Sequence, residues 1–294
     1  MGQFEIAGAS ADDIRALGEW AADEGWNPGD SDGQAFFPTD PDGFLFGRLD
    51  GEPVASISAV RYGTDFGFIG FYIARPSVRG QGYGIQVWRA GMARLAGRNV
   101  GLDGVIDQQD NYRASGFRRA WNNIRYEGVP SSGGGDGGGA GGARGGEWRD
   151  GITLRDARTV PFGQLAAYDR RFFPAPRPGF LASWVGLPDR TALVAIRDGE
   201  LDGFAVMRAS RGASRIGPLY ASSQEVAAAL VGGLSATSPG APVAIDVPDI
   251  NAPSVELMER LGLSPSFEAA RMYTGPDPDV DLAGLFAVTS LELG

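Results

Sequence analysis

The chain has 294 residues and a net charge of −10, and it contains no histidine, no cysteine and no lysine. These absences exclude a Ser-His-Asp triad, a thiol nucleophile, a zinc finger, a lysine Schiff base and a Walker-A phosphate loop. The negative charge opposes binding to the phosphates of nucleic acids. No apolar run is long enough to span a bilayer, so we expect a cytoplasmic protein with neither a membrane nor a nucleic-acid partner.

A glycine-rich segment divides the chain into two parts. Residues 131–146 contain ten glycines in sixteen positions, a composition that buries no apolar surface and behaves as a flexible coil. A chain of this length is also expected to form two domains. The sequence therefore predicts a first domain at 1–130, a linker at 131–146 and a second domain at 147–294.

The first domain opens with apolar residues at helical spacing, which predict a helix over 12–23 capped by Ser10 or Asp12. Asp50-Gly51 is a strong hairpin signal. The run FGFIGFYIA is apolar without alternation, so it is expected to be a central strand buried on both faces. The predicted order is this helix, strands at 44–49, 54–62 and 66–74, a helix after residue 84, a strand at 100–106, a short helical turn at 111–116 and a strand at 121–127.

Three glycines alternate between the central strand and the next helix, in Arg79-Gly80-Gln81-Gly82-Tyr83-Gly84. Unhindered backbone N–H groups at a helix N-terminus form an anion site that suits a pyrophosphate. The dinucleotide fingerprint G-x-G-x-x-G fails here, because its sixth position is Ile85 or Val87. A nicotinamide cofactor is therefore disfavoured.

These residues resemble the GNAT superfamily of acetyl-CoA-dependent N-acetyltransferases. The family's pyrophosphate motif, [R/Q]-x-x-G-x-[G/A], matches residues 79–84, and its Tyr-x-x-x-Gly-Phe element behind an asparagine matches residues 111–117. Short phrases such as EGWNPG at 24–29 and IGPLYA at 216–221 resemble the tandem-domain YitH-like subgroup. The resemblance implies an α+β fold, with two tandem GNAT-like domains that each have a central mixed sheet flanked by helices.

The second domain reads as a degenerate copy of the first. A strand at 192–196, a turn at Asp198-Gly199 and a strand at 201–208 repeat the order of the first half. Where the phosphate loop is expected, residues 217–223 lack alternating glycines, and Pro218 removes an N–H. Met258 stands where the first half has Tyr112. We therefore expect acetyl-CoA to bind only the first domain, with the second shaping the acceptor pocket or serving structure alone.

The resemblance also assigns the cofactor contacts and the catalytic acid. The backbone of the central strand is expected to pair with pantetheine, the glycine loop to hold the pyrophosphate, and Asn111 to cap a helix or contact the cofactor. The phenol of Tyr112 is the candidate acid that protonates the leaving thiolate. The cofactor-binding residues are thus Tyr72, Ile73, Ala74, Arg79, Gly80, Gln81, Gly82, Tyr83, Gly84 and Asn111.

The base has several candidates because the chain has no histidine. Asp107 follows a predicted buried strand beside Tyr112, and Asp32 lies in the loop where GNAT folds form the acceptor site. Glu24, Asp110 and a water relay without an essential base remain alternatives. The acceptor amine is expected to meet Trp26, Asn27 and Asp32, which offer an aromatic face, an amide and a carboxylate.

The predicted function is transfer of an acetyl group from acetyl-CoA to a primary amine of a small molecule, such as an amino acid, a polyamine or an amino sugar, by direct attack and without a metal. A non-catalytic acyl-CoA sensor is an alternative. A tandem-GNAT aminoacyl-type transferase is disfavoured, because the negative charge of the chain repels tRNA. Both a monomer and a homodimer remain open.

Overall fold

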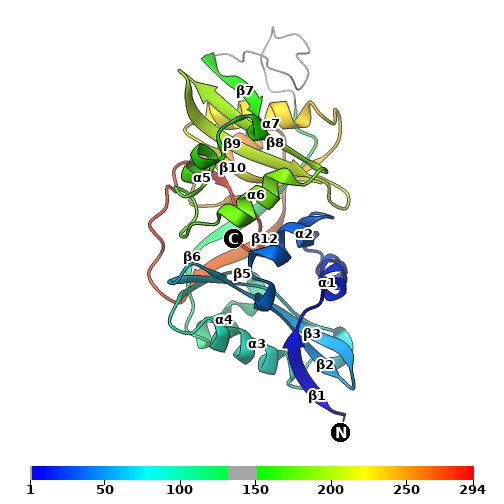
Figure 1. Ribbon diagram of the computed structural model, residues 1–294. Helices are drawn as coiled ribbons and strands as arrows, with labels where there is room; N and C mark the ends of the chain where they lie inside the picture. Colours follow the sequence, from blue (N-terminus) through cyan, green and yellow to red (C-terminus); the bar gives the residue numbers. More distant parts are fainter. Residues whose placement is uncertain (1, 132–150) are drawn as a thin grey trace.

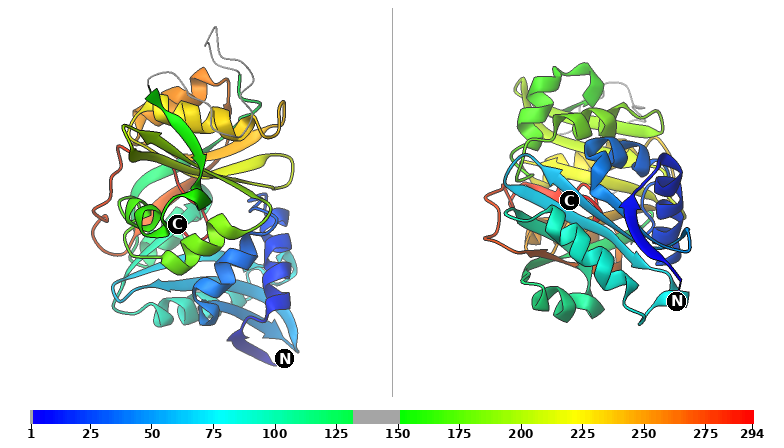
Figure 2. Two further views of the ribbon diagram at one scale, coloured as in Figure 1. Left: turned by 45° about the horizontal axis from the view of Figure 1, so that its top comes forward. Right: turned by 60° about the horizontal axis from the view of Figure 1, so that its bottom comes forward.

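The computed structural model describes residues 2–131 and 151–294. Two halves of similar make-up are stacked on each other, and residue 294 lies between them (Figures 1 and 2). Apart from Ser131, the glycine-rich linker predicted at 131–146 lies outside the described residues. None of the described helices is long and apolar enough to cross a membrane.

The first half confirms the predicted order and adds two elements. The helix at α1 is capped by Ser10, whose side chain and that of Asp13 form a reciprocal capping box. The meander is confirmed as β2, β3 and β4. The strand β1 and the five-residue helix α2 were not predicted, because β1 is largely exposed and α2 is too short for a periodic pattern. The elements are β1 (Phe4–Gly8), α1 (Ala11–Asp23), α2 (Asp32–Phe36), β2 (Phe44–Leu49), β3 (Glu52–Tyr62), β4 (Phe66–Ala74), α3 (Tyr83–Arg94), β5 (Asn99–Val105), α4 (Gln109–Ala114) and β6 (Arg118–Gly128).

The second half repeats this plan. The predicted strand, turn and strand at 192–208 are confirmed as β8 and β9. The phosphate-loop counterpart was misplaced, because β10 runs through Ala221 and only Ser222-Ser223 separate it from α7. The elements are β7 (Thr153–Asp156), α5 (Phe162–Asp169), α6 (Pro178–Gly186), β8 (Arg190–Arg197), β9 (Glu200–Arg208), β10 (Ser214–Ala221), α7 (Gln224–Ser235), β11 (Val243–Pro248), α8 (Ala252–Arg260), β12 (Ser264–Tyr273) and β13 (Leu285–Ala287).

The two halves share one mixed sheet because they exchange strands. The order is β1-β2-β3-β4-β5-β12-β6-β11-β10-β9-β8-β7, with β13 on β10. β12 of the second half lies between β5 and β6 of the first, and β6 in turn pairs with β11. The expected α+β class with two GNAT-like domains is confirmed. The sequence suggested that the strand at 121–127 ends the sheet of the first half. Instead, β6 pairs on both sides with strands of the second half, β11 and β12.

Helices cover both faces of this sheet. α3 packs on β2–β4, and α7 packs on β8–β10, each on the outer face of its half (Figure 1). α2 and α6 meet between the halves, where the ring of Phe36 stacks on that of Trp184 at 5.7 Å. One apolar cluster therefore runs from the first half into the second.

The two halves differ where their central strands diverge. In the first half, β4 pairs with β5 only as far as Ile69 and Leu102. In the second half, β10 leaves β11 after Ile216, but β13 then pairs with β10 at Leu219 and Tyr220. The gap is thus filled by the chain itself in the second half, whereas in the first half no described strand occupies it.

Candidate active site

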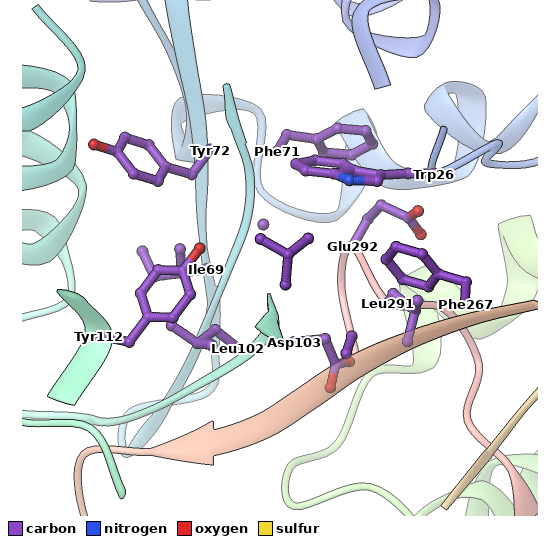
Figure 3. Close-up of a pocket in the computed structure, with 13 residues that line it drawn as sticks. Trp26, Ile69, Phe71, Tyr72, Leu102, Asp103, Tyr112, Phe267, Leu291 and Glu292 are labelled. Carbon is purple, nitrogen blue, oxygen red and sulfur yellow. The ribbon is translucent and has the colours of Figure 1, made fainter. Parts of the chain in front are cut away.

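A pocket of about 500 Å³ lies where β4 and β5 separate (Figure 3). β4 contributes Ile69, Gly70, Phe71 and Tyr72 to its lining, and β5 contributes Leu102, Asp103 and Val105. Tyr112 lies at one side, and the opposite wall comes from Trp26, Phe267, Ala269, Leu291 and Glu292. Four of the lining residues are far from the others along the chain and come from the second half: Phe267, Ala269, Leu291 and Glu292.

A backbone irregularity in β4 opens this pocket. Phe71 has a φ of 45°, in the left-handed region, and the pairing of β3 with β4 shifts register between Ser56 and Ser58. The Ser56 hydroxyl donates to the Phe71 carbonyl over 2.9 Å. β4 consequently turns away from β5, and the edge predicted to bind a cofactor, Tyr72 to Ala74, has no β5 partner. The Ala74 carbonyl accepts from Arg79 Nε over 2.9 Å.

The glycine loop has the conformation that an anion cradle needs. Gly80 and Gly82 have φ values of 76° and 85°, and Gly82 is the left-handed N-cap of α3. Both positions are exposed, and nothing lies within 4 Å of where a Cβ would stand. The N-terminal N–H groups of α3 therefore face open space beside small residues, which fits a pyrophosphate. Gly84 lies against the Tyr72 hydroxyl, which joins this loop to the pocket wall.

Three side chains of the glycine loop make contacts with other residues of the protein. The Arg79 guanidinium forms an ion pair with Glu24 at the end of α1, and Arg79 is half exposed. Gln81 Nε2 donates to the Ser77 carbonyl over 3.0 Å, and the Tyr83 ring packs on Phe4 at 4.8 Å. The loop is therefore held from both sides while its backbone stays open.

Tyr112, the predicted acid, lines the pocket. Its ring packs against Trp88 at 5.5 Å and against Gly104, where any Cβ would overlap it. Its hydroxyl points toward the middle of the pocket (Figure 3). Burial, with a smaller contribution from Tyr72, raises the pKa of Tyr112 to about 12, so the phenol is protonated at neutral pH.

Asn111 lies one residue away but on the exposed side of α4. Its Nδ2 donates to Gln108 Oε1 over 2.7 Å. It is inside the helix and not at its cap, since α4 begins at Gln109, so the capping alternative is wrong. The structure places Asn111 outside the pocket lining.

Asp32 does not face the pocket, which corrects its prediction as a base and as an acceptor contact. Its side chain is 1% exposed. Oδ1 accepts from Arg190 at 2.8 Å, and Oδ2 accepts from Arg208 at 3.0 Å and from the Gly29 N–H at 2.8 Å. These cations hold the pKa of Asp32 below its usual value, although burial raises it. Asp32 therefore joins the two halves and has no free oxygen for a substrate.

The prediction that Asp107 is a buried base is also wrong. It lies on the exposed single turn η4 (Ile106–Gln108) and does not line the pocket. Among the predicted acceptor residues, Trp26 is in the lining. Asn27 instead presents its carbonyl to Arg215 Nη1 at 3.2 Å and to the Ser210 hydroxyl at 3.0 Å. Asn27 thus binds the second half through its backbone.

Two acids of the pocket lining were missed. Asp103 on β5 accepts two bonds from Arg271, at 2.8 and 2.7 Å, and one from Asn123 at 2.7 Å. Burial raises the pKa of Asp103 and the Arg271 guanidinium lowers it. Glu292 is 3% exposed, and neither of its oxygens has a partner among the described residues. Glu292 is the one charged residue in the segment 285–293, and this was the signal that could have pointed to it.

No group of three or more acids with the spacing of a metal site occurs in the described part of the chain. The open edge of β4 and the glycine cradle suit a phosphate-bearing donor such as an acyl-CoA. A family model for the acetyltransferase (GNAT) family matches residues 13–117, and a model for an acetyltransferase (GNAT) domain matches residues 165–287. The chain belongs to the GNAT family and has two GNAT domains in tandem.

Known proteins agree with this assignment. The holothin acyltransferase of Pseudoalteromonas sp. (strain SANK 73390) is 30% identical over 287 residues, which cover 97% of this chain and 93% of the relative. A putative acetyltransferase from Pyrococcus horikoshii superposes with a TM-score of 0.78 at 21% identity, covering 99% of this chain and 96% of its own. A tandem GNAT protein from the clavulanic acid biosynthesis pathway gives 0.63 at 16% identity, with 94% and 100% covered. The protein is an acyltransferase that uses acyl-CoA donors.

Proposed function

We propose that this acyltransferase moves an acetyl group from acetyl-CoA to a primary amine of a small molecule. The observation that carries the proposal is the single pocket that joins the unpaired edge of β4, the Tyr112 hydroxyl and a wall from the second half. A donor lying along β4 would bring its thioester to the same space that an acceptor enters from the other side. Direct attack needs such a shared, enclosed space.

The donor side belongs to the first half. The backbone of Tyr72, Ile73 and Ala74 offers pantetheine an unpaired strand edge, and Gly80 and Gly82 offer the pyrophosphate their backbone N–H groups. The corresponding edge of β10 is paired with β13. We therefore expect one donor site per chain, in the domain at 1–130, with the domain at 147–294 contributing to the acceptor side.

The acceptor side favours a small molecule with a flat or apolar body. Trp26, Phe71 and Phe267 line it with aromatic faces, and such a lining suits a small molecule. A small acceptor also agrees with the name of the curated relative, whose substrate is holothin. The aromatic faces suit planar heteroaromatic amines at least as well as aliphatic ones.

Tyr112 supports the departure of the thiolate. A phenol with a pKa near 12 is a weaker acid than a thiol, whose pKa is about 8.5. It therefore stays protonated in the resting enzyme and donates a hydrogen bond to the sulfur as negative charge develops there.

The test is a screen of an amine library with acetyl-CoA, followed by thiol release and mass spectrometry of the product. The library includes amino acids, polyamines, amino sugars, aromatic amines and holothin, and the donors include acetyl-, propionyl- and hexanoyl-CoA. We expect saturable acetylation of a planar or aromatic primary amine. Stoichiometric acetyl-CoA binding without turnover of any amine would contradict the proposal and favour a sensor.

A further inference from the structure

Glu292 lies at the acceptor side of the pocket in an unusual setting. The segment after β13, residues 288–294, is buried throughout and lies between the two halves. Glu292 lines the pocket beside Trp26 and Phe267 (Figure 3). Both carboxylate oxygens lack a hydrogen-bond partner among the described residues and are shielded from solvent, so a polar group that entered the pocket beside them would meet an unsatisfied acceptor.

Other buried acids nearby are already committed. Asp103, which also lines the pocket, is held by Arg271 and Asn123. Asp32 binds Arg190 and Arg208. A buried carboxylate without a partner costs stability, so it is retained where it serves another purpose.

The segment that carries Glu292 is fixed against β4. A Cβ at Gly70 would overlap the Glu292 carbonyl, so β4 and this segment are in direct contact. The Tyr62 hydroxyl donates to the Leu293 carbonyl over 3.1 Å, and the Leu293 N–H donates to the Ser290 hydroxyl over 3.0 Å. Glu292 is therefore held rigidly beside the stretch of β4 along which the thioester is proposed to lie.

The charges that act on Glu292 come from several elements. Arg125 on β6, Arg208 on β9 and Arg215 on β10 attract protons away from it, and Asp32 on α2 acts in the opposite sense. Arg125 and Arg215 share Asp246 on β11, and Arg208 shares Asp32 with Arg190. Four arginines thus face two aspartates. Burial raises the pKa of Glu292, this surplus of positive charge offsets part of that rise, and it also disfavours an ammonium ion nearby.

We propose that Glu292 is the catalytic base of the acetyl transfer, a step that rests on the proposed function. Its carboxylate takes a proton from the acceptor ammonium, and the freed nitrogen lone pair forms a bond to the thioester carbonyl carbon. The C–S bond then breaks, and its electron pair leaves with the CoA sulfur beside the Tyr112 hydroxyl. The nitrogen gives up its second proton as the adduct collapses, this proton passes to the sulfur through the Tyr112 hydroxyl, and Glu292 releases the first proton as the products leave.

The experiment compares the wild-type chain with Glu292→Gln and Glu292→Asp. Glutamine keeps the size of the side chain and cannot accept the proton, so kcat should fall about 10²- to 10³-fold. The dissociation constant of acetyl-CoA, measured by calorimetry, should stay within about twofold. The wild-type rate should fall on the acid side of the pH profile of kcat/KM, and this limb should be lost in Glu292→Gln. Aspartate, one methylene shorter, should restore part of the rate. Glu200→Gln, an exposed site on β9, is the matched control.

Thermal unfolding supplies a measurement that needs no acceptor. Burial raises the pKa of Glu292 above its ordinary value of 4.5, so the stability it contributes is full below that value and is lost as the pH rises through the raised one. Glu292→Gln should therefore melt at or above the wild-type temperature at neutral pH.

Three results would overturn the assignment. One is a Glu292→Gln variant within about threefold of wild-type kcat that keeps the acid limb. Another is a lower melting temperature of that variant at neutral pH, which would make Glu292 a counter-ion of the arginines. A wild-type chain that binds acetyl-CoA and acetylates no amine would instead overturn the proposed function, and the base with it.

Discussion

Asp32→Asn is the variant that most directly separates the sequence-based expectation from the tertiary structure. The carboxylate of Asp32 is buried between Arg190 and Arg208, whose side chains are 0% and 1% exposed. An isosteric amide keeps the shape of the side chain and removes its charge. Two buried guanidinium groups are then left without their counter-ion.

The expected loss of stability is large. Removing one partner of a buried ion pair costs about 3–5 kcal/mol, because the remaining charge stays desolvated. In a chain of 294 residues, that corresponds to a fall in melting temperature of roughly 5–8 °C. Since the pKa of Asp32 is lowered in the folded protein, its contribution is present above its unfolded pKa and lost as the pH falls through the folded one. The difference between wild type and variant should therefore shrink in acid.

Tryptophan fluorescence during thermal or urea unfolding measures this effect. Trp184 stacks on Arg190 at 3.9 Å and on Arg208 at 4.6 Å, so it reports on this contact between the halves. Asp12→Asn is the control, because Asp12 pairs with Arg15 on the exposed surface of α1, and it should leave the midpoint unchanged. A normal midpoint for Asp32→Asn together with a raised KM for the amine would refute this reasoning and restore Asp32 to the acceptor site.

Further predictions concern the donor site and the sharing of strands. Tyr112→Phe should lower kcat about 10- to 150-fold in steady-state kinetics, which corresponds to a charge-assisted hydrogen bond of about 1.5–3 kcal/mol, and acetyl-CoA affinity should hardly change; an unchanged kcat would mean that the sulfur leaves unaided. Gly82→Asp should abolish acetyl-CoA binding in calorimetry, because it places a carboxylate in the cradle. The control Gly212→Asp, at an exposed glycine with a φ of 79°, should not abolish it. Two donor sites in the parent chain would contradict the inference that the gap beside β10 is filled. A chain that ends at residue 131 lacks β12, so β5 and β6 lose their common neighbour, and it should aggregate; a soluble, active fragment would show that the strand exchange is dispensable.

The sequence by itself determined the local features of the proposed donor site. The hairpin at Asp50-Gly51, the buried run of β4 and the left-handed glycines of the loop depend on neighbouring residues, and the structure has them where the sequence predicts them. Tyr112 was proposed from the resemblance of residues 111–117 to a family motif, and the structure has the short helix α4 at this place. Backbone conformation and apolar periodicity are short-range properties, and a motif built from them can be read without the fold.

The acceptor side was decided by the tertiary structure alone. Asp32 looked like a polar loop residue, but Arg190 and Arg208, more than 150 positions away, take both of its oxygens. Glu292 carried no motif, and it reaches the pocket only because β12 enters the first half and the segment after β13 passes between the halves. Whether a carboxylate is a base or half of an ion pair depends on which distant charges share its low-dielectric surroundings, and only the packing of the whole chain fixes that.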